Sequence, residues 1–252
     1  MKTLSALRVN VFMGIIPIIS LAIACTKSNL PITQALISTD TVVHNDTTHY
    51  DTSKTYTYLA LGDSYTIGQS VNSTDRFPAQ TVQLLANQHI KIVSPLYIAT
   101  TGWTTYSLLS AIASQNPTPG FDIVTLLIGV NDQYQHVDTA TYRSRFTQCL
   151  QKAITLSANR PTRVLVLSIP DYSATPFVPA GSKPQVSMEI DWFNAINRQV
   201  TQQYNITYID ITPSTRLAAI DPTLIANDGL HPSGKAYAVW ANMLAPIIKG
   251  KL

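Results

Sequence analysis

The chain has 252 residues, of which 45% are hydrophobic and 12% are charged, so it can bury a full core and its composition excludes a disordered protein. A formal charge of +3, from 17 Lys and Arg against 14 Asp and Glu, gives no reason to expect a nucleic-acid partner. The histidines lack the spacing of metal ligands, because their only close pair, His44 and His49, lies in a polar Thr-rich stretch. No metal site is therefore predicted.

Residues 1–24 have the features of an export signal. Lys2 and Arg8 precede the apolar stretch 9–24, which is short for a membrane span and contains Pro17. A cleaved signal peptide is therefore favoured over a permanent helix. The stretch ends in Leu21-Ala22-Ile23-Ala24-Cys25, which resembles the lipobox of bacterial lipoproteins. That resemblance implies cleavage before Cys25 and acylation of this cysteine.

The lipobox resemblance is imperfect, because Ala22 stands where leucine is usual. The alternatives are an ordinary secreted protein with an incidental cysteine and an uncleaved anchor. Acylation of Cys25 predicts a membrane-anchored protein of the cell envelope or surface, whereas the secreted alternative predicts a periplasmic or external one. Residues 25–54 are rich in Thr, Ser, Asp and Asn, which predicts a flexible linker before a folded domain at 55–252.

Within the predicted domain, apolar runs alternate with segments whose apolar residues recur at spacings of three and four. The predicted strands are 56–61, 90–98, 123–128, 163–169 and 206–211, and the predicted helices are 77–88, 106–114, 141–159, 186–203 and 233–248. Near-continuous apolar strands that are each followed by a helix indicate a parallel sheet covered on both faces. The fold class predicted from this alternation is α/β, with about five parallel strands.

Two features of the helical half of this pattern bear on function. The Pro-rich segment 175–184 interrupts the alternation and is predicted to be a surface loop that can border the site. Cys149 lies on the apolar face of the predicted helix 141–159 and lacks a histidine in any recognisable constellation. We expect it to be a buried thiol and not a nucleophile.

A serine, a histidine and a carboxylate occur in settings that suit nucleophilic catalysis. Gly62-Asp63-Ser64-Tyr65 follows the first predicted strand, so Ser64 is expected at the carboxyl edge of the sheet, where ligands of open α/β sheets bind. Asp228-Gly229-Leu230-His231 lies near the other end of the chain, and His231 precedes Pro232, which favours a loop before the last helix. A hydroxyl needs a base to become nucleophilic, and the base needs a third group to orient it.

Two further segments follow strands at the same expected edge. Gly102 lies in the loop after the second predicted strand, where glycine permits close backbone approach and leaves its N–H free to donate. Gly129-Val130-Asn131-Asp132 follows the third, and an asparagine amide is an established donor to a tetrahedral oxyanion. Asp63 and Asp132 are expected to support turns. Tyr65 and Trp103 are candidates for a substrate wall, although aromatic packing under the loop is the more common role for such residues.

These four blocks, in this order, resemble those of the SGNH hydrolases, also called GDSL esterases and lipases, over almost all of the predicted domain. The resemblance implies Ser64 as nucleophile, His231 as base and Asp228 as the carboxylate that orients it. It implies an oxyanion hole built from the Ser64 N–H, the Gly102 N–H and the Asn131 side chain. It also implies a flavodoxin-like three-layer α/β/α sandwich and a reaction that needs no metal or organic cofactor.

Other interpretations of the same residues are weaker. Each block has a purely structural interpretation as a helix cap or a turn, but four coincidences in family order count against it. An α/β-hydrolase shares the chain order of Ser, Asp and His, yet its nucleophile elbow needs a glycine two residues after the serine, where this chain has Thr66.

The resemblance leaves the substrate open, because family members act on acetylated sugars, lysophospholipids, short acyl esters and thioesters. We expect a serine esterase for small-acyl esters, carried on carbohydrate, in a protein held on a membrane by its N-terminal lipid. The alternatives are a lysophospholipase or thioesterase-type acyl hydrolase, a non-catalytic glycan-binding surface lipoprotein, and a purely structural envelope protein. The sequence does not fix the oligomeric state.

Overall fold

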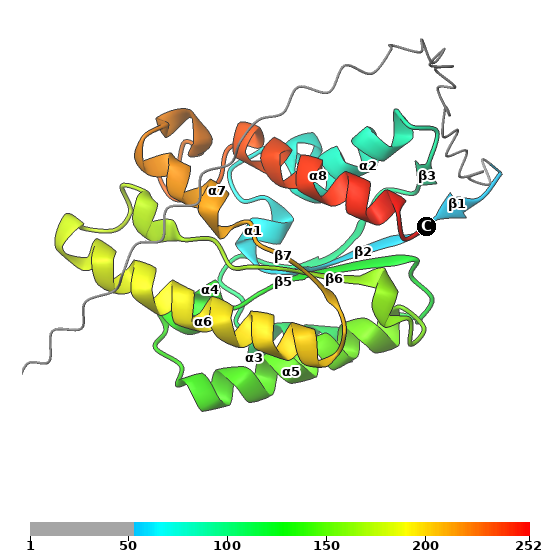
Figure 1. The fold of residues 1–252 in the computed structure, drawn as a ribbon, viewed down its shortest axis with the longest axis horizontal. Coiled ribbons are helices and arrows are strands. Elements are labelled where there is room, and N and C mark those ends of the chain that lie inside the picture. The colour runs from blue at the N-terminus through cyan, green and yellow to red at the C-terminus, as the bar shows by residue number, and fades with distance from the viewer. Residues whose placement is uncertain (1–52) are drawn as a thin grey trace, which may run out of the picture. The chain divides into compact units, whose positions relative to one another are not determined.

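A parallel sheet of five strands forms the centre of the computed structural model, which describes residues 53–252 (Figure 1). The strands are β2 (Tyr58–Gly62), β4 (Leu96–Ala99), β5 (Ile123–Leu127), β6 (Val164–Leu167) and β7 (Thr207–Ile209). Their spatial order is β4-β2-β5-β6-β7, so the first strand along the chain lies between the second and the third. This is the doubly wound order of flavodoxin-like folds, and the predicted fold class is confirmed. The predictions for residues 1–24, Cys25 and most of the linker lie outside the described residues.

The register of the central strands aligns their carboxyl ends. β2 pairs with β4 and β5 in parallel, and Gly62 at the end of β2 lies level with Ala99 of β4 and Leu127 of β5. The chain therefore leaves all three strands at the same edge. The point where strand order reverses lies between β2 and β5, and this is where open α/β sheets bind their ligands.

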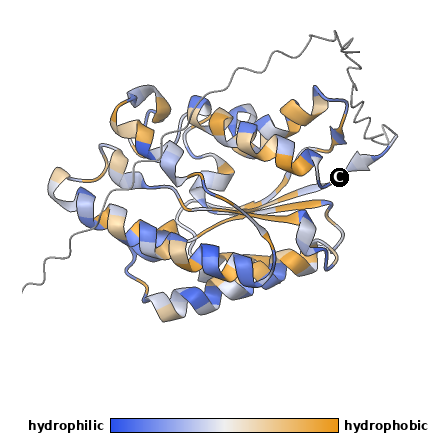
Figure 2. Ribbon diagram, viewed as in Figure 1, coloured by the Kyte–Doolittle hydropathy of each residue, from blue (hydrophilic) through white to orange (hydrophobic). Residues whose placement is uncertain are grey.

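Helices cover both faces of the sheet (Figure 1). On one face α2 (Phe77–Ala86) packs against α8 (Gly234–Lys249), and on the other lie α3 (Thr105–Gln115), α5 (Thr139–Leu156) and α6 (Lys183–Gln203). Figure 2 shows hydrophobic strands between helices whose hydrophilic residues face outward. This distribution explains the periodic patterns, because strands between two helical layers are apolar throughout whereas each helix buries one face.

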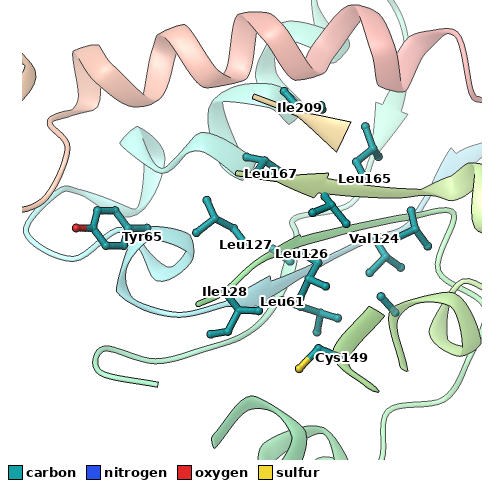
Figure 3. Packing of buried hydrophobic residues seen from close by; sticks show 14 of the residues in the cluster. Leu61, Tyr65, Val124, Leu126, Leu127, Ile128, Cys149, Leu165, Leu167 and Ile209 are labelled. Atoms are coloured by element: carbon teal, nitrogen blue, oxygen red, sulfur yellow. The ribbon is translucent and has the colours of Figure 1, made fainter. Parts of the chain in front are cut away.

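The core lies on both sides of the sheet, and all five residues of β5 are buried. Figure 3 shows Leu126 of β5 and Leu61 of β2 packed with neighbouring strand residues, and Cys149 of α5 beside them. Cys149 is fully buried, as predicted, and burial raises the pKa of its thiol far above the ordinary value. A thiol that stays protonated is a poor nucleophile.

Two predicted strands are divided in the structure. The run 56–61 splits at Thr57, whose backbone N–H donates to Asp122 at 3.1 Å and therefore leaves the ladder. The run 90–98 splits before Pro95, which has no N–H for a sheet. The outer halves, β1 (Thr55–Tyr56) and β3 (Lys91–Ile92), pair with each other in a separate two-stranded sheet.

Short helical segments were not predicted, because a single turn carries no periodicity. Three are α-helical turns, α1 (Ser64–Ile67), α4 (Val130–Tyr134) and α7 (Thr212–Arg216). Six are 3₁₀ turns, Ser73–Asp75, Pro161–Arg163, Tyr172–Ala174, Ala180–Ser182, Leu217–Ala219 and Pro222–Leu224. In the part of the chain that the structure describes, no helix is both long and apolar enough to cross a membrane.

Substitution of Gly129 tests how the turn between β5 and α4 packs against α5. The φ of Gly129 is +130°, and an added Cβ would lie 2.1 Å from the hydroxyl oxygen of Tyr142. We expect Gly129→Ala to lower the free energy of unfolding by about 2–4 kcal/mol, because backbone strain and overpacking add. Gly120 is the matched control, since its φ is +137° but an added Cβ would meet nothing within 4 Å. Urea denaturation of both variants measures the difference, and equal losses would contradict this explanation.

Candidate active site

The predicted site residues surround one cavity at the carboxyl edge of the sheet. Its volume is about 170 Å³, and Ser64, Gly102, Asn131 and His231 all line it. They come from four segments that are distant in sequence, three of which directly follow β2, β4 and β5. The strand register described above is what brings these segments together. Asp228 lies behind His231 and contacts its ring.

Ser64 is the first residue of α1, which folds back directly from the end of β2. Asp63 caps this helix, because its carboxylate accepts the Tyr65 N–H at 3.0 Å. Gly62 permits the tight reversal, since a Cβ there would lie 2.4 Å from the Leu127 carbonyl oxygen. The N–H of Ser64 begins the helix and has no partner within it, so it is available as a donor at the cavity.

Asp63 is fully buried, and burial raises the pKa of its carboxyl to about 8, with the nearby Asp132 carboxylate adding to the effect. The hydrogen bond from the Tyr65 N–H opposes this rise but does not overcome it. Asp63 is therefore protonated at neutral pH and serves the turn, as predicted from the sequence. It contributes no negative charge beside Ser64.

His231 and Asp228 form a close pair. The Nδ1 atom of His231 lies 2.6 Å from Oδ2 of Asp228, and the backbone N–H of His231 donates to Oδ1 at 2.9 Å. Nδ1 is thereby engaged and Nε2 is left for the cavity side of the ring. The ring of Tyr65 packs against the imidazole, and the centroids of the two rings lie 5.2 Å apart. Ser64 and His231 both line the cavity, and in the described part of the chain no hydrogen bond joins their side chains. Hydrogen bonds between catalytic groups often form fully only when substrate is bound.

Asp228 remains charged because several donors surround it. Partial burial disfavours its charged form, but hydrogen bonds from Ser70 and from the side chain and backbone of His231 outweigh burial. The pKa of Asp228 is consequently lowered below its ordinary value. A permanently ionised carboxylate is what fixes an imidazole tautomer and stabilises its protonated form.

Ser70 is a site residue that the sequence analysis missed. Its hydroxyl donates to Oδ2 of Asp228 at 2.6 Å, the same oxygen that contacts His231. The backbone of Ser70 has a φ of +67°, which is uncommon for a residue other than glycine. No sequence signal marks this contact, because 158 positions separate the two residues and Ser70 lies in no recognised block.

The loop that carries Gly102 and the helix that carries Asn131 are tied to each other. The Asn131 amide donates to the Trp103 carbonyl at 3.0 Å. Next to it, the Asp132 carboxylate accepts both the backbone N–H of Thr105 at 2.8 Å and its hydroxyl at 2.6 Å. Burial raises the pKa of Asp132, although the Thr105 hydrogen bonds oppose the rise. Asp132 thus supports the site structurally, as expected.

The two candidates for a substrate wall lie in different places. Tyr65 lines the cavity, whereas Trp103 packs against the hydrophobic core and does not border the cavity. Phe177 confirms that the predicted loop 175–184 borders the site. The loop is shorter than predicted, since α6 begins at Lys183 and Pro184 fits its first turn.

No cluster of three or more His, Cys, Asp or Glu within residues 53–252 could hold a metal ion. The cavity itself presents the side chains and backbone amides described above. These comprise a hydroxyl, an imidazole oriented by a carboxylate, and the amide-bearing residues Gly102 and Asn131. Such a set can transfer an acyl group.

Comparison with known proteins agrees with this geometry. The model of the GDSL-like Lipase/Acylhydrolase family matches residues 60–239. No curated protein matches the chain. Similar solved structures include a lipase/acylhydrolase from Enterococcus faecalis, with 18% identity, a TM-score of 0.59, and coverage of 78% of this chain and 97% of that one.

Two esterases are similar to a comparable extent. An acetylxylan esterase from Geobacillus stearothermophilus has 17% identity and a TM-score of 0.59, with 77% of this chain and 94% of that one covered. The esterase EstA from Pseudoalteromonas sp. has 18% identity and a TM-score of 0.56, with 77% and 97% covered. At these identities the likeness shows a shared fold.

Proposed function

The chain is an ester hydrolase of the GDSL-like lipase/acylhydrolase family, and we propose that it hydrolyses small-acyl esters through an acyl-enzyme on Ser64. The observation that carries this proposal is the cavity of about 170 Å³, in which Ser64 and His231 stand together with the segments of Gly102 and Asn131. A space of this size suits an acetyl or similarly short acyl group.

In the proposed reaction, the Ser64 hydroxyl attacks the ester carbonyl carbon while Nε2 of His231 accepts its proton. The tetrahedral intermediate collapses, the bond to the alcohol breaks, and His231 returns the proton to the departing oxygen. Water then attacks the acyl-enzyme by the same route and releases the acid and free Ser64. Asp228 keeps the imidazole in the required tautomer and stabilises the imidazolium.

The oxyanion of each tetrahedral intermediate is stabilised by the N–H groups of Ser64 and Gly102 and by the amide of Asn131. Gly102 has a φ of +82°, and an added Cβ would meet nothing within 4 Å. The backbone conformation at position 102 therefore explains why glycine stands there, whereas crowding does not. The Asn131 amide donates to the Trp103 carbonyl and the Asp132 carboxylate accepts from Thr105, so the Gly102 loop and α4 are held together before substrate binds.

We infer from the lipobox-like sequence that the protein is exported and anchored by an acylated Cys25. Polysaccharide esters and lipids are the esters that an anchored external enzyme meets. The apolar lining of the small cavity supports an acyl group, and the acetylxylan esterase neighbour is consistent with an acetylated carbohydrate. No nucleic-acid partner is proposed.

Replacement of Ser64 tests the chemistry. We expect Ser64→Ala to abolish hydrolysis of p-nitrophenyl acetate and labelling by a fluorophosphonate probe. Asn131→Ala is the matched control, because it should retain labelling while kcat falls by about 10² to 10³, the usual effect of losing one oxyanion donor. Full turnover in Ser64→Ala would rule out the mechanism.

The ester series acetate, butyrate and octanoate tests the acyl preference in the same assay. Turnover that rises toward octanoate would contradict the small-acyl proposal. An absence of both labelling and turnover would favour the non-catalytic glycan-binding alternative.

Ser70→Ala tests the positioning of Asp228. Without this donor the pKa of Asp228 rises, the Asp228–His231 pair holds its proton more tightly, and the acid limb of the kcat/KM profile moves to higher pH. We expect kcat/KM to fall about tenfold, mainly through kcat, which corresponds to one hydrogen bond to a charged group. Ser73→Ala, at an exposed nearby position, is the control. Identical pH profiles for the two variants would contradict a positioning role.

Metabolic labelling with palmitate tests the anchor in a bacterial host. We expect the full chain to incorporate the label and to fractionate with membranes, and Cys25→Ala to do neither, because the thiol is the acylation site. Cys149→Ala should retain the label, since Cys149 is buried in the domain. An unlabelled full chain would contradict acylation, and its fractionation would then distinguish an ordinary secreted protein from an uncleaved anchor.

A further inference from the structure

A second cavity lies beside the active-site cavity and has a volume of about 350 Å³. The two cavities share three aromatic lining residues, Tyr134, Tyr172 and Phe177. The centroids of these rings lie 6.3 Å apart in each pair, so they form one cluster. Tyr134 and Phe177 are each about half exposed, at 55% and 48%, and present ring surface at the boundary between the cavities.

The remainder of the second cavity is mixed, because Val178, Pro179 and Val186 line it together with a chain of polar side chains. Gln133 donates from its amide to Glu189 at 2.7 Å and accepts the hydroxyl of Tyr172 at 2.9 Å. Gln185 donates to the other oxygen of Glu189 at 2.8 Å. Gln133 is 2% exposed, so the inner end of this network is built into the protein, whereas Gln185 at its outer end is exposed.

The loop that carries Phe177 is held at both ends. Before it, Asp171 is buried and accepts hydrogen bonds from Arg216 at 2.8 Å and from Ser187 at 2.6 Å. After it, the Lys183 ammonium donates to the Thr175 carbonyl at 3.0 Å. These contacts fix the loop against α6 and α7 without a ligand. The second cavity is therefore preformed, which reduces the ordering that binding requires.

Aromatic surface on one side and oriented amides with a carboxylate on the other match one class of ligand. The C–H faces of a sugar ring pack on aromatic rings, and its hydroxyls both donate to carboxylates and accept from amides. The carboxylate of Glu189 disfavours an anionic ligand, and the polar side chains disfavour a long alkyl chain, which would take them out of water without offering hydrogen bonds. The volume lies in the range of pockets for small molecules.

We propose that the second cavity binds the alcohol part of the ester and that this part is a neutral saccharide. The inference rests on the proposed esterase function for the orientation of the substrate. The acyl group occupies the small cavity with Ser64, and the sugar that carries it lies across Tyr134 and Phe177 against Gln185 and Glu189. The ester oxygen then lies at the boundary of the two cavities.

Gln185→Ala tests this assignment, since Gln185 lines only the second cavity and is exposed on α6. The variant is assayed with two substrates, acetylated xylotriose and p-nitrophenyl acetate, which carry the same acyl group. We expect kcat/KM for acetylated xylotriose to fall about tenfold, mainly through a higher KM, because one ligand hydrogen bond is lost. Turnover of p-nitrophenyl acetate should stay within twofold. Gln203→Ala, at an exposed position at the end of the same helix, should change neither rate.

Val186→Phe, which adds bulk to the second cavity, should produce the same selective loss of activity on acetylated xylotriose.

A binding measurement separates this inference from the proposed function. Calorimetric titration of unacetylated xylotriose into Ser64→Ala should show binding that Gln185→Ala weakens in the double variant. Ser64-dependent hydrolysis of p-nitrophenyl esters without hydrolysis or binding of either saccharide would overturn the saccharide site and leave the esterase intact. Saccharide binding without any ester turnover would overturn the proposed function and retain the binding site. Equal effects of Gln185→Ala on both acetate esters would also overturn the assignment.

Discussion

The parallel register of β2 with β5 is the constraint on which the site depends. Because Gly62 lies level with Leu127, the chain leaves both strands at one edge, on either side of the point where strand order reverses. Ser64 follows the first strand by two residues and Asn131 follows the second by four. Both strands are buried on both faces, so a slip in register would move apolar side chains out of their packing and is disfavoured.

Four carboxylates near this edge have different roles because their surroundings differ. Asp63 and Asp132 are buried, and burial raises their pKa values, so they serve as hydrogen-bond acceptors that fix turns. Asp171 and Asp228 receive enough donors to outweigh burial, and their pKa values are lowered. Only the last of these contacts the histidine of the cavity. The position of each donor therefore decides whether burial or hydrogen bonding sets the direction in which the pKa of each carboxyl moves.

The sequence predicts the sheet, the long helices and all five residues of the proposed triad and oxyanion hole, because each leaves a local signal. Apolar runs mark buried strands, and the blocks around Ser64 and His231 are contiguous in sequence. Ser70 and the Gln133–Glu189 network leave none, since their partners are distant in sequence and their residue types are common on any surface. The prediction of one continuous strand over 90–98 was wrong, although Pro95, which has no N–H for a sheet, was a signal that the strand is interrupted.

The short helix α4 links the two cavities. Within five residues it provides Asn131 to the active-site cavity, Gln133 to the polar network and Tyr134 to the boundary between them. Asp132, on the same turn, anchors the helix to Thr105 through two hydrogen bonds. A ligand that moves the backbone of α4 at Tyr134 would also move Asn131, which lies three residues earlier in the same helix. In the proposed reaction, a substrate contact at Tyr134 would act on the proposed oxyanion donor Asn131 through this short helix, which is how binding energy distant from a reacting bond can contribute to its cleavage.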